Sequence, residues 1–528
     1  MAGVDSLEAL LRTAARLRPD LKVEVVAGTV DGCRIGRIDD DSRRIGPGDL
    51  FVARPGTVSD GAAHIADAVA AGAAAILGEA PDPPGVEGGQ RAVRLRVAEP
   101  LEAGVAFARA RWGDPADRLR IAGVTGTNGK TTVATFIRQL VAGTIGPCGL
   151  VGTIETHDGR AARPARVTTP GRIELVELLA GMVDAGCDRL AMEVSSHALD
   201  QGRVADLDFE VAIFTNLSGD HLDYHRTMEA YAEAKARLFD GLGREGVAVV
   251  NLDDPAAERM LRNAGGRRIG IFRRGAAASR TGHARVDRSV SYEIVAIEPA
   301  GMVVRVAGLG GDGPDGVGIE IPLRLHGAYN AFNVTAALVS AIELGVPVDD
   351  AAALASRLEA PRGRLEAAHD VAAGDRVRVF VDYAHTDDAI ATVLAAMRDS
   401  VPEGGRLVAV IGAGGDRDRG KRPRMMRAAL DHADRVAVTS DNPRTEDPEA
   451  IVREVASGAG PGETADYFIE VDRRRAIDRV VQEADDGDVV VIMGKGHEAF
   501  QLVGVERRPF DDRAVAVEAL ERRRGAGG

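Results

Sequence analysis

Short apolar runs alternate with segments of helical periodicity along most of the chain. Residues 119–124 form an apolar run of strand length, and residues 131–141 carry apolar side chains at the spacing of one helix face. Strands that alternate with helices are typical of parallel sheets covered on both faces. Further strands are predicted at residues 189–193, 211–215, 246–251, 377–381, 406–411, 435–439 and 488–493, and further helices at 173–185 and 227–239. Residues 49–53 and 74–77 are short apolar runs among Ala-rich helical stretches.

Residues 286–325 have a different pattern. Apolar and polar side chains alternate at residues 291–296 and 302–306, as they do in antiparallel strands with one exposed face. Residues 308–318 are rich in glycine. We predict a small antiparallel sheet here, with a glycine-rich turn between its strands.

The length of 528 residues is too great for one hydrophobic core. Residues 112–115 read as a linker, and a second alternating series begins near residue 359. We predict an α/β protein of three domains, at residues 1–113, 114–357 and 358–528. Residues 81–89, rich in proline and glycine, are predicted to form a loop.

Composition narrows the class of protein. Hydrophobic residues make up 45% of the chain and charged residues 28%, which is ordinary for a globular protein. The formal net charge of −14 argues against non-specific nucleic-acid binding. We see no signal peptide and no apolar run of the ~20 residues that cross a bilayer, so no membrane partner is expected. Cys33, Cys148 and Cys187 lie far apart, and we expect buried free thiols in the cytoplasm.

The most informative segment is residues 123–132, with the sequence GVTGTNGKTT, between a predicted strand and a predicted helix. Its glycines allow backbone N–H groups to surround phosphate oxygens at the positive end of a helix. Lys130 can reach the outer phosphates, and the Thr131 hydroxyl can bind Mg²⁺. Val124 stands where the general phosphate-loop pattern has glycine. A glycine-rich turn without a ligand would leave the Gly-Lys-Thr-Thr ending unexplained, so we predict nucleotide binding.

Polar clusters follow several of the predicted strands. Open α/β sheets bind ligands at the carboxyl ends of their strands, so six such clusters predict a shared cleft. The clusters begin at Glu193, Thr215, Asp382, Gly412, Ser440 and Gly494.

Some of these polar residues also have plain structural interpretations. Glu193 and His221 could ligate Mg²⁺, although a hard cation prefers oxygen to imidazole. By its sequence alone, Lys235 is a solvated lysine on a predicted helix. A role as hydrogen-bonded structural histidines is our interpretation for His197, His225 and His385.

Together these motifs resemble those of the Mur ligases of bacterial peptidoglycan synthesis. The sequence TGTNGKTT at residues 125–132 is similar to that family's phosphate loop, which accounts for Val124. Within the family, the chain resembles the MurE type, which adds the third amino acid of the peptide. The resemblance covers about residues 41–512, and its motifs lie at residues 193–199, 215–225, 382–386, 414–423, 441–444 and 494–498.

The resemblance implies a domain plan, a reaction and its ligands. An N-terminal domain would bind the UDP end of the substrate, a central domain would bind ATP, and a Rossmann-like C-terminal domain would bind an amino acid. The reaction implied is ATP-dependent ligation of meso-2,6-diaminopimelate to UDP-N-acetylmuramoyl-L-alanyl-D-glutamate, in the cytoplasm and with Mg²⁺. We expect an acyl-phosphate intermediate and a monomeric enzyme.

The resemblance also implies roles for individual residues. Lys130, Glu193, His221 and Lys235 would be catalytic. Lys235 matches a lysine that the family carbamylates, and a carbamate would be a carboxylate-like ligand that joins Thr131, Glu193 and His221 around magnesium. ATP would contact Gly126, Thr127, Asn128, Gly129, Lys130, Thr131, Thr132, Asn330, Arg364 and Asp382. The UDP-dipeptide would contact Ser42, Thr168, Thr169, Ser195, Gln201 and Arg203. Diaminopimelate would contact Arg417, Asp441, Asn442, Arg444, Gly494 and Glu498.

The prediction of which amino acid is added depends on Arg444. The motif of residues 441–444 resembles that of enzymes that select meso-diaminopimelate, whose second carboxylate can pair with a guanidinium through two parallel hydrogen bonds. Lysine would leave the guanidinium unpaired, at a cost on the order of a few kcal/mol. The alternatives are the same ligation with L-lysine, a folylpolyglutamate synthase, and a regulatory P-loop NTPase or catalytically silent binding module.

Overall fold

The computed structural model describes residues 5–56, 60–79, 92–275, 285–311, 313–370, 375–460 and 466–526. The chain forms two compact units. The first comprises Met1–Lys130, Val141–Ala248 and Glu258–Arg268, and the second comprises Thr131–Leu140, Val249–Ala257 and Ile269–Gly528. The predicted loop at residues 81–89 lies outside the described residues.

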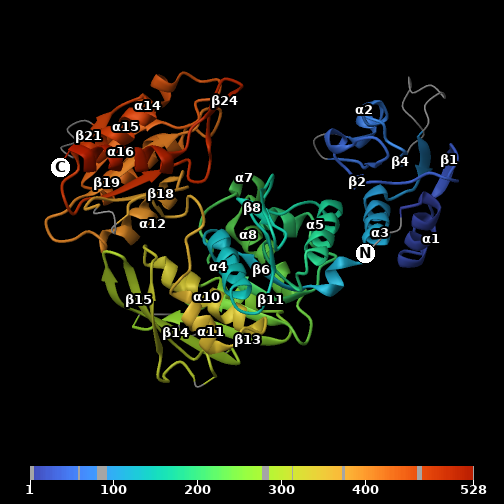
Figure 1. Ribbon diagram of the computed structural model, residues 1–528, viewed down its shortest axis with the longest axis horizontal. Helices are drawn as coiled ribbons and strands as arrows, with labels where there is room; N and C mark the ends of the chain where they lie inside the picture. Colours follow the sequence, from blue (N-terminus) through green and yellow to red (C-terminus); the bar gives the residue numbers. More distant parts are fainter. Residues whose placement is uncertain are drawn as a thin grey trace. The chain divides into compact units, whose positions relative to one another are not determined.

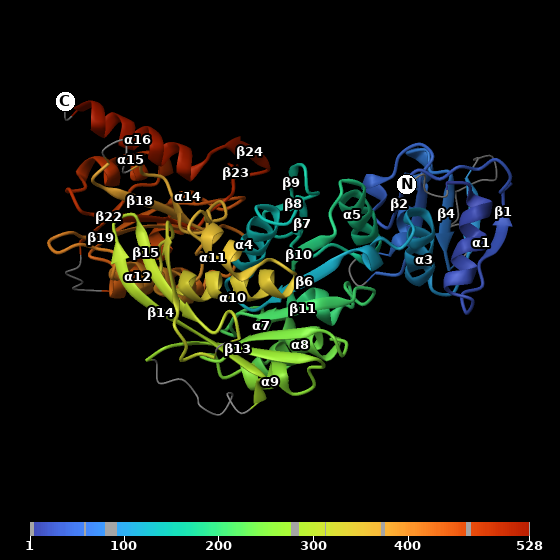
Figure 2. The same ribbon diagram turned by 60° about the horizontal axis from the view of Figure 1, so that its bottom comes forward.

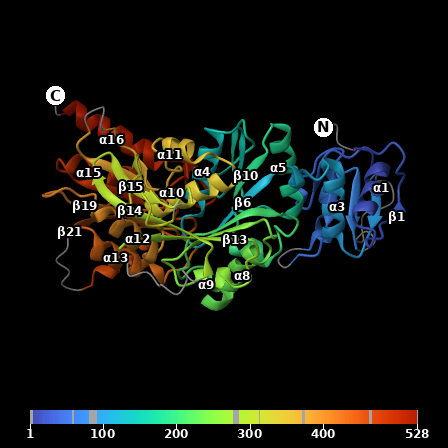
Figure 3. The ribbon, with the colours of Figure 1, turned by 90° about the horizontal axis from the view of Figure 1, so that it is seen from below.

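The N-terminal part is a five-stranded sheet in the order β1-β5-β4-β3-β2 (Figure 1). Its strands are parallel except for β1, which is antiparallel to β5. Alternate side chains of the strands enter two cores, one with α1 and α3, which lie side by side (Figure 3), and one with α2. The elements are α1 (Leu7–Leu17), β1 (Glu24–Ala27), β2 (Ile38–Asp39), η1 (Ser42–Arg44), β3 (Leu50–Ala53), η2 (Gly61–His64), α2 (Ile65–Ala70), β4 (Ala75–Gly78), β5 (Val93–Arg96) and α3 (Pro100–Trp112).

The middle of the chain forms an eleven-stranded sheet in the order β16-β15-β14-β13-β12-β11-β6-β10-β7-β8-β9 (Figure 2). Strands β10, β6 and β11 are parallel neighbours, as predicted, and β7, which was not predicted, pairs in parallel with β10. The elements are η3 (Pro115–Arg118), β6 (Arg120–Thr125), α4 (Lys130–Ala142), β7 (Cys148–Val151), β8 (Glu155–His157), β9 (Ala162–Pro164), α5 (Arg172–Asp184), β10 (Arg189–Glu193), α6 (Ser196–Asp200), β11 (Phe209–Phe214), α7 (Leu222–His225), α8 (Met228–Asp240), β12 (Val247–Asn251), α9 (Ala257–Leu261), β13 (Arg267–Arg273), β14 (Arg288–Glu298), β15 (Gly301–Ala307), β16 (Ile319–Leu323), α10 (Tyr329–Glu343) and α11 (Val348–Ala355).

The antiparallel strands β14, β15 and β16 pair with one another as predicted. They do not form a separate small sheet, because β14 also pairs in parallel with β13 and so extends the central sheet. The glycine-rich turn packs against β14, where the Ser291 hydroxyl donates a hydrogen bond to the Pro314 carbonyl at 2.7 Å.

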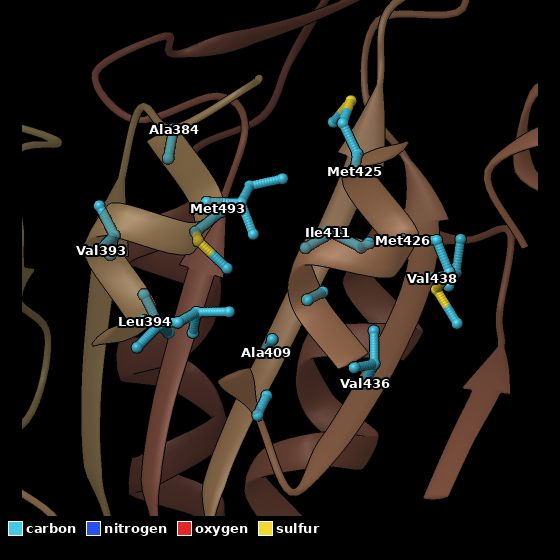
Figure 4. Close-up of a cluster of buried hydrophobic side chains, with 14 of the residues drawn as sticks. Ala384, Val393, Leu394, Ala409, Ile411, Met425, Met426, Val436, Val438 and Met493 are labelled. Atoms are coloured by element: carbon cyan, nitrogen blue, oxygen red, sulfur yellow. The ribbon is translucent and has the colours of Figure 1, made fainter. Parts of the chain in front are cut away.

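The C-terminal part is a six-stranded sheet in the order β17-β18-β22-β19-β20-β21, parallel except for β17. Helices α12, α13 and α14 cover one face, and α15 and α16 cover the other. Figure 4 shows part of the core on the first face, with Leu394 of α12 and Met426 of α13. The elements are β17 (Glu366–Ala367), β18 (Arg378–Asp382), α12 (Asp387–Arg398), β19 (Leu407–Ala413), α13 (Lys421–His432), β20 (Arg435–Ser440), α14 (Pro448–Ala456), η5 (Ser457–Ala459), β21 (Asp466–Ile469), α15 (Arg473–Glu483), β22 (Val489–Met493), β23 (Phe500–Val503), β24 (Glu506–Pro509) and α16 (Asp512–Ala526).

The predicted fold class is confirmed, with parallel sheets covered by helices. Within the described residues, no helix is long and apolar enough to cross a bilayer. All three cysteines are free, and Cys148 and Cys187 are buried as expected. Cys33 is only partly buried, contrary to expectation.

Candidate functional site

The phosphate loop joins β6 to α4, as predicted. Val124 is a fully buried strand residue that pairs with Glu193 of β10, so the glycine of the general pattern is not needed there. The loop proper turns at Gly126, where φ is +149° and a Cβ atom would lie 1.9 Å from the Thr215 hydroxyl. Both the backbone conformation and the lack of space therefore require glycine at this position.

The residues that follow β11 hold the loop in place. The Thr215 hydroxyl donates to the carbonyl of Asn128 at 2.5 Å. The Asn216 side chain accepts a hydrogen bond from the backbone N–H of Asn128 at 2.9 Å and donates to its carbonyl at 3.1 Å. The cluster that begins at Thr215 was predicted as part of a ligand cleft, and its first two residues shape the phosphate loop itself.

Two lysine ammonium groups meet at one carbonyl oxygen of this loop. Lys130 Nζ donates to the carbonyl of Gly126 at 2.9 Å and to that of Thr127 at 2.9 Å. Lys235, on α8, donates to the same Gly126 oxygen at 2.8 Å and lies 4.2 Å from the ring centre of Tyr231. Lys235 is only 1% exposed, so its interpretation as a solvated lysine is wrong.

This environment disfavours charge on Lys235. Burial lowers the pKa of Lys235 well below its ordinary value, and repulsion from Lys130 lowers it further. Burial also raises the pKa of the Tyr231 phenol to about 12, so the ring beneath the lysine stays neutral. A neutral amine at Lys235 is a nucleophile, unlike an ammonium group.

Glu193 ends β10 as a buried carboxylate with a fixed orientation. Its Oε1 accepts from the backbone N–H of Thr153 at 2.6 Å, and its Oε2 accepts from the Thr153 hydroxyl at 3.0 Å. The Thr153 hydroxyl lies 3.1 Å from that of Thr168. Thr153 was not singled out from the sequence, because no motif marks a threonine forty residues before the carboxylate that it orients.

His221 lies in a cluster of rings beside these residues. Its backbone has φ +54°, its side chain is 45% exposed, and its Nε2 lies 3.4 Å from Asp220 Oδ2. The ring contacts join His197, His221, Tyr224, His225 and Tyr231, with His197 and His221 centred 4.8 Å apart. His225 Nε2 lies 2.9 Å from the Ser196 hydroxyl, which fits its structural interpretation.

The residues predicted to hold the dipeptide form one network. The Thr169 hydroxyl donates to the carbonyl of Glu193 at 2.9 Å, and Ser195 caps α6. Arg203 donates to the carbonyl of Thr169 at 2.9 Å and to the Gln201 side chain at 2.7 Å. Ser42 lies in η1, whose capping residue Asp41 accepts from Arg166 at 3.1 Å.

In the second unit, Asp382 ends β18 as a buried carboxylate. It accepts backbone hydrogen bonds from Leu365 and Ala384, both at 2.8 Å. Burial raises the pKa of Asp382, and the nearby Arg364 guanidinium opposes that shift. Asn330 is buried in α10, where its side chain donates to the His326 carbonyl at 2.7 Å.

A further polar cluster lies at the ends of β20 and β22. Lys495 is fully buried, and its Nζ lies 3.1 Å from Asn442 Oδ1, 3.3 Å from Glu498 Oε2 and 3.8 Å from Asp441 Oδ1. The Asn442 amide donates to Glu498 at 2.7 Å. Among the residues that the structure describes, Asp441 Oδ1 is buried and has no hydrogen-bond partner. Gly494 fits here because a Cβ atom would lie 2.9 Å from Asp441 Oδ2.

Arg444 lies over a pair of glycines. Its Nη1 donates to the carbonyl of Gly415 at 2.7 Å, and a Cβ atom on Gly414 would lie 2.8 Å from that nitrogen. Arg417 is exposed in the same loop. His385, which follows β18, lies 2.8 Å from the Tyr383 carbonyl through Nδ1, in keeping with its structural interpretation.

Known proteins share this arrangement along the whole chain. Family models match residues 34–109 (Mur ligase family, catalytic domain), 124–341 (Mur ligase middle domain) and 363–496 (Mur ligase, glutamate ligase domain). A Gloeobacter violaceus protein named UDP-N-acetylmuramoyl-L-alanyl-D-glutamate–2,6-diaminopimelate ligase is 42% identical over 497 residues, which are 93% of this chain and 95% of that protein.

This chain belongs to the Mur ligase family. An Alkalilimnicola ehrlichii protein with the same name is 40% identical over 97% of this chain and 100% of its own length. A solved structure of a ligase of that name matches 99% of both chains at 32% identity, with a TM-score of 0.62.

Within this Mur ligase, each unit gathers its own share of the predicted residues. The phosphate-loop residues up to Lys130, together with Glu193, His221 and Lys235, lie in the first unit, and Thr131 and Thr132 belong to the second. Asp441, Asn442 and Glu498 meet in the second. The cleft predicted to unite both sets stays a prediction. The sequence analysis did not predict a role for Lys495 in this polar cluster. Its only signal in the sequence is its position between two glycines in the motif of residues 494–498.

We expect Lys235→Met to change how stability depends on pH. The pKa of Lys235 is near its ordinary value of 10.5 in the unfolded chain and is lower in the folded protein. Between these two pKa values the unfolded state binds more protons, so the free energy of unfolding of the wild type rises with pH. The penalty of burying the ammonium is complete below the folded pKa and is lost above about pH 10.5. Melting temperatures in CO₂-free buffer should therefore favour the variant at neutral pH, by at least about 2 °C, with a difference that shrinks towards pH 10.

The matched control is Lys22→Met, which removes an exposed lysine. Its difference from wild type should not change with pH. An equally flat difference for Lys235→Met would contradict the account of that residue.

Proposed function

We propose that this chain is an ATP-dependent ligase that joins meso-2,6-diaminopimelate to UDP-N-acetylmuramoyl-L-alanyl-D-glutamate in peptidoglycan precursor synthesis. The proposal is carried by Arg444, whose guanidinium is held over Gly414 and Gly415. It is supported by the relatives of that name, which are about as long as this chain.

ATP would bind at the phosphate loop. Lys130 now donates to two loop carbonyls, and the phosphates of a nucleotide would offer its ammonium group stronger, charged acceptors. In the second unit, Asn330, Arg364 and Asp382 are proposed to contact the nucleotide. The rest of the loop set is Gly126, Thr127, Asn128, Gly129, Thr131 and Thr132.

The residues present fit magnesium that is held mainly through the nucleotide. Over the described parts of the chain, no three His, Cys, Asp or Glu side chains form a metal cage. Mg²⁺ usually keeps one or two protein carboxylates together with substrate phosphates. Glu193 would supply a carboxylate whose orientation Thr153 fixes, with Thr131, His221 and Lys235 in the form of a carbamate as further ligands. When bound, the ion would neutralise charge on the phosphates.

We propose that Lys235 becomes a carbamate. Its neutral amine would attack CO₂, form a C–N bond and release a proton, which replaces a disfavoured cation by an anion beside Lys130. Incubation with carbon-13 bicarbonate should give a carbamate signal by NMR in the wild type and none in Lys235→Met. A wild-type enzyme that turns over without that signal would refute the modification.

The proposed reaction has two steps. A γ-carboxylate oxygen of D-glutamate attacks the γ-phosphorus of ATP, the bond to ADP breaks, and an acyl phosphate forms. An amine of diaminopimelate then attacks the acyl carbon, loses a proton and expels phosphate. No protein nucleophile is needed, so this chain's residues act by positioning and by charge, with Lys130 opposite the phosphates. Thr168, Thr169, Ser195, Gln201 and Arg203 would hold the dipeptide, and Ser42 would lie near the uridine.

The acceptor would bind between Arg444 and Asp441. Diaminopimelate has two ammonium groups and two carboxylates. One ammonium group would donate to Asp441 Oδ1, which accepts no hydrogen bond among the described residues, while the far carboxylate would pair with Arg444. Arg417, Asn442, Gly494 and Glu498 would complete the pocket. L-Lysine lacks the second carboxylate and is the remaining alternative acceptor.

Two further expectations stand with this proposal. We infer a cytoplasmic location, because ATP and UDP-linked precursors are cytoplasmic molecules. We also propose that the enzyme is a monomer, and sedimentation that gives a larger species would refute this.

Phosphate release with the UDP-dipeptide, ATP and a panel of amino acids tests the proposal. We expect turnover with meso-diaminopimelate, little with L-lysine, and loss of turnover in Lys130→Ala. Arg444→Ala should lower kcat/KM for diaminopimelate by about 10- to 100-fold, as expected for a lost charge-assisted pair.

Arg453→Ala is the control, since Arg453 forms an exposed ion pair with Glu449 in the same C-terminal part. Its kcat/KM for diaminopimelate should equal that of the wild type. Equal rates with L-lysine and diaminopimelate in the wild type would refute the proposed acceptor, and ATP turnover without the dipeptide would favour a regulatory NTPase.

A further inference from the structure

We infer that Arg422 is a positioning residue for the acceptor pocket, because it ties together the two loops that carry Arg417 and Arg444. The inference rests on the proposed function, since it concerns how the pocket selects a second carboxylate. Arg422 lies in the first turn of α13, behind both loops.

The Arg422 guanidinium is fully buried and has three partners. Its Nη1 donates to Glu446 at 2.9 Å and to Glu454 at 2.6 Å. Its Nη2 donates to Glu446 at 2.8 Å and to the carbonyl of Gly414 at 3.2 Å. A single side chain thus reaches the loop after β19, the loop after β20, and helix α14.

Glu446 also binds Asp416, the second residue after Gly414 in the loop that follows β19. Its Oε1 accepts from the backbone N–H of Asp416 at 2.5 Å. The Asp416 side chain in turn accepts from the Thr445 hydroxyl at 2.7 Å and from its backbone N–H at 3.1 Å. Between these contacts, the carbonyl of Gly415 accepts the hydrogen bond from Arg444. The register of the two loops therefore sets where the Arg444 guanidinium lies.

Both loops are held in conformations that they would not adopt alone. Asp416 has φ +54° and Arg444 has φ +51°, in the left-handed region that side-chain-bearing residues avoid. A Cβ atom on Gly415 would lie 1.9 Å from the carbonyl of Pro443, so the loops touch backbone to backbone. Strain of this kind persists only where surrounding contacts over-determine it. Without Arg422, Glu446 and Glu454 would lose their shared buried cation, and fewer contacts would fix the register of the two loops.

A merely structural arginine would affect stability alone, whereas a positioning residue would affect the acceptor selectively. For Arg422→Met we expect KM for diaminopimelate to rise about tenfold or more, with KM for ATP and for the UDP-dipeptide within twofold. We also expect the ratio of kcat/KM for diaminopimelate to that for L-lysine to fall about tenfold. Arg422→Lys should keep part of the wild-type ratio, because an ammonium can still pair with Glu446.

Arg406→Met is the matched control. Arg406 pairs with the buried Asp488 at 2.8 Å, at the opposite end of the same strands from these loops. It should lower the melting temperature comparably and leave both KM for diaminopimelate and the acceptor ratio unchanged. Glu446→Gln, a milder change to the same network, should shift the ratio in the same direction and replaces Arg422→Met if that variant does not fold.

The outcomes separate this inference from the proposed function. Wild-type turnover with diaminopimelate, together with wild-type acceptor ratios in Arg422→Met or Glu446→Gln, would overturn the positioning role alone. A wild-type enzyme that adds no diaminopimelate would overturn the proposed function and this inference with it.

Discussion

The region around the phosphate loop depends on two lysine side chains that donate hydrogen bonds to one carbonyl oxygen. Lys130 and Lys235 both donate to Gly126, whose conformation only glycine tolerates. Like charges this close repel, and burial of Lys235 leaves little water to screen them. The arrangement therefore favours loss of charge from Lys235 and the arrival of an anion beside Lys130. Phosphates and a carbamate would relieve the repulsion in complementary ways.

The cluster after β20 and β22 combines one buried lysine with two carboxylates. Lys495 is shared among Asn442, Glu498 and Asp441, yet one oxygen of Asp441 accepts no hydrogen bond among the described residues. A buried carboxylate oxygen without a donor is costly, so an ammonium group is the ligand that this place accommodates best. The proposed substrates would bring phosphates to the first region and an ammonium group to the second.

Much of the fold follows from local pattern. Strand β10 was predicted with its observed bounds, because a strand buried on both faces is a continuous apolar run between polar ends. The strands β8, β9 and β21 are three or four residues long and partly exposed, so they left no such run. The junction of β13 with β14 also escaped prediction, since strand pairing is set by tertiary contacts and not by the periodicity of either strand.

The site residues likewise fall into those that motifs predict and those that depend on tertiary contacts. Motifs marked the phosphate loop, Glu193 and Arg444, because their chemistry requires particular residues at short spacing. Burial of Lys235 depends on Gly126, which lies 109 positions earlier. The roles of Lys495 and Arg422 depend on loops that meet only in the folded chain. Nothing in the pattern around those residues distinguishes a buried cation from an exposed one.

The central claim is that ATP activates the substrate carboxylate before the amine attacks. It is tested most directly with UDP-dipeptide that carries oxygen-18 in both oxygens of its D-glutamate γ-carboxylate. The account predicts that each phosphate released during amide formation carries one labelled oxygen, since the bridging oxygen of the acyl phosphate leaves with phosphorus. Unlabelled phosphate, released while the amide product accumulates, would contradict it.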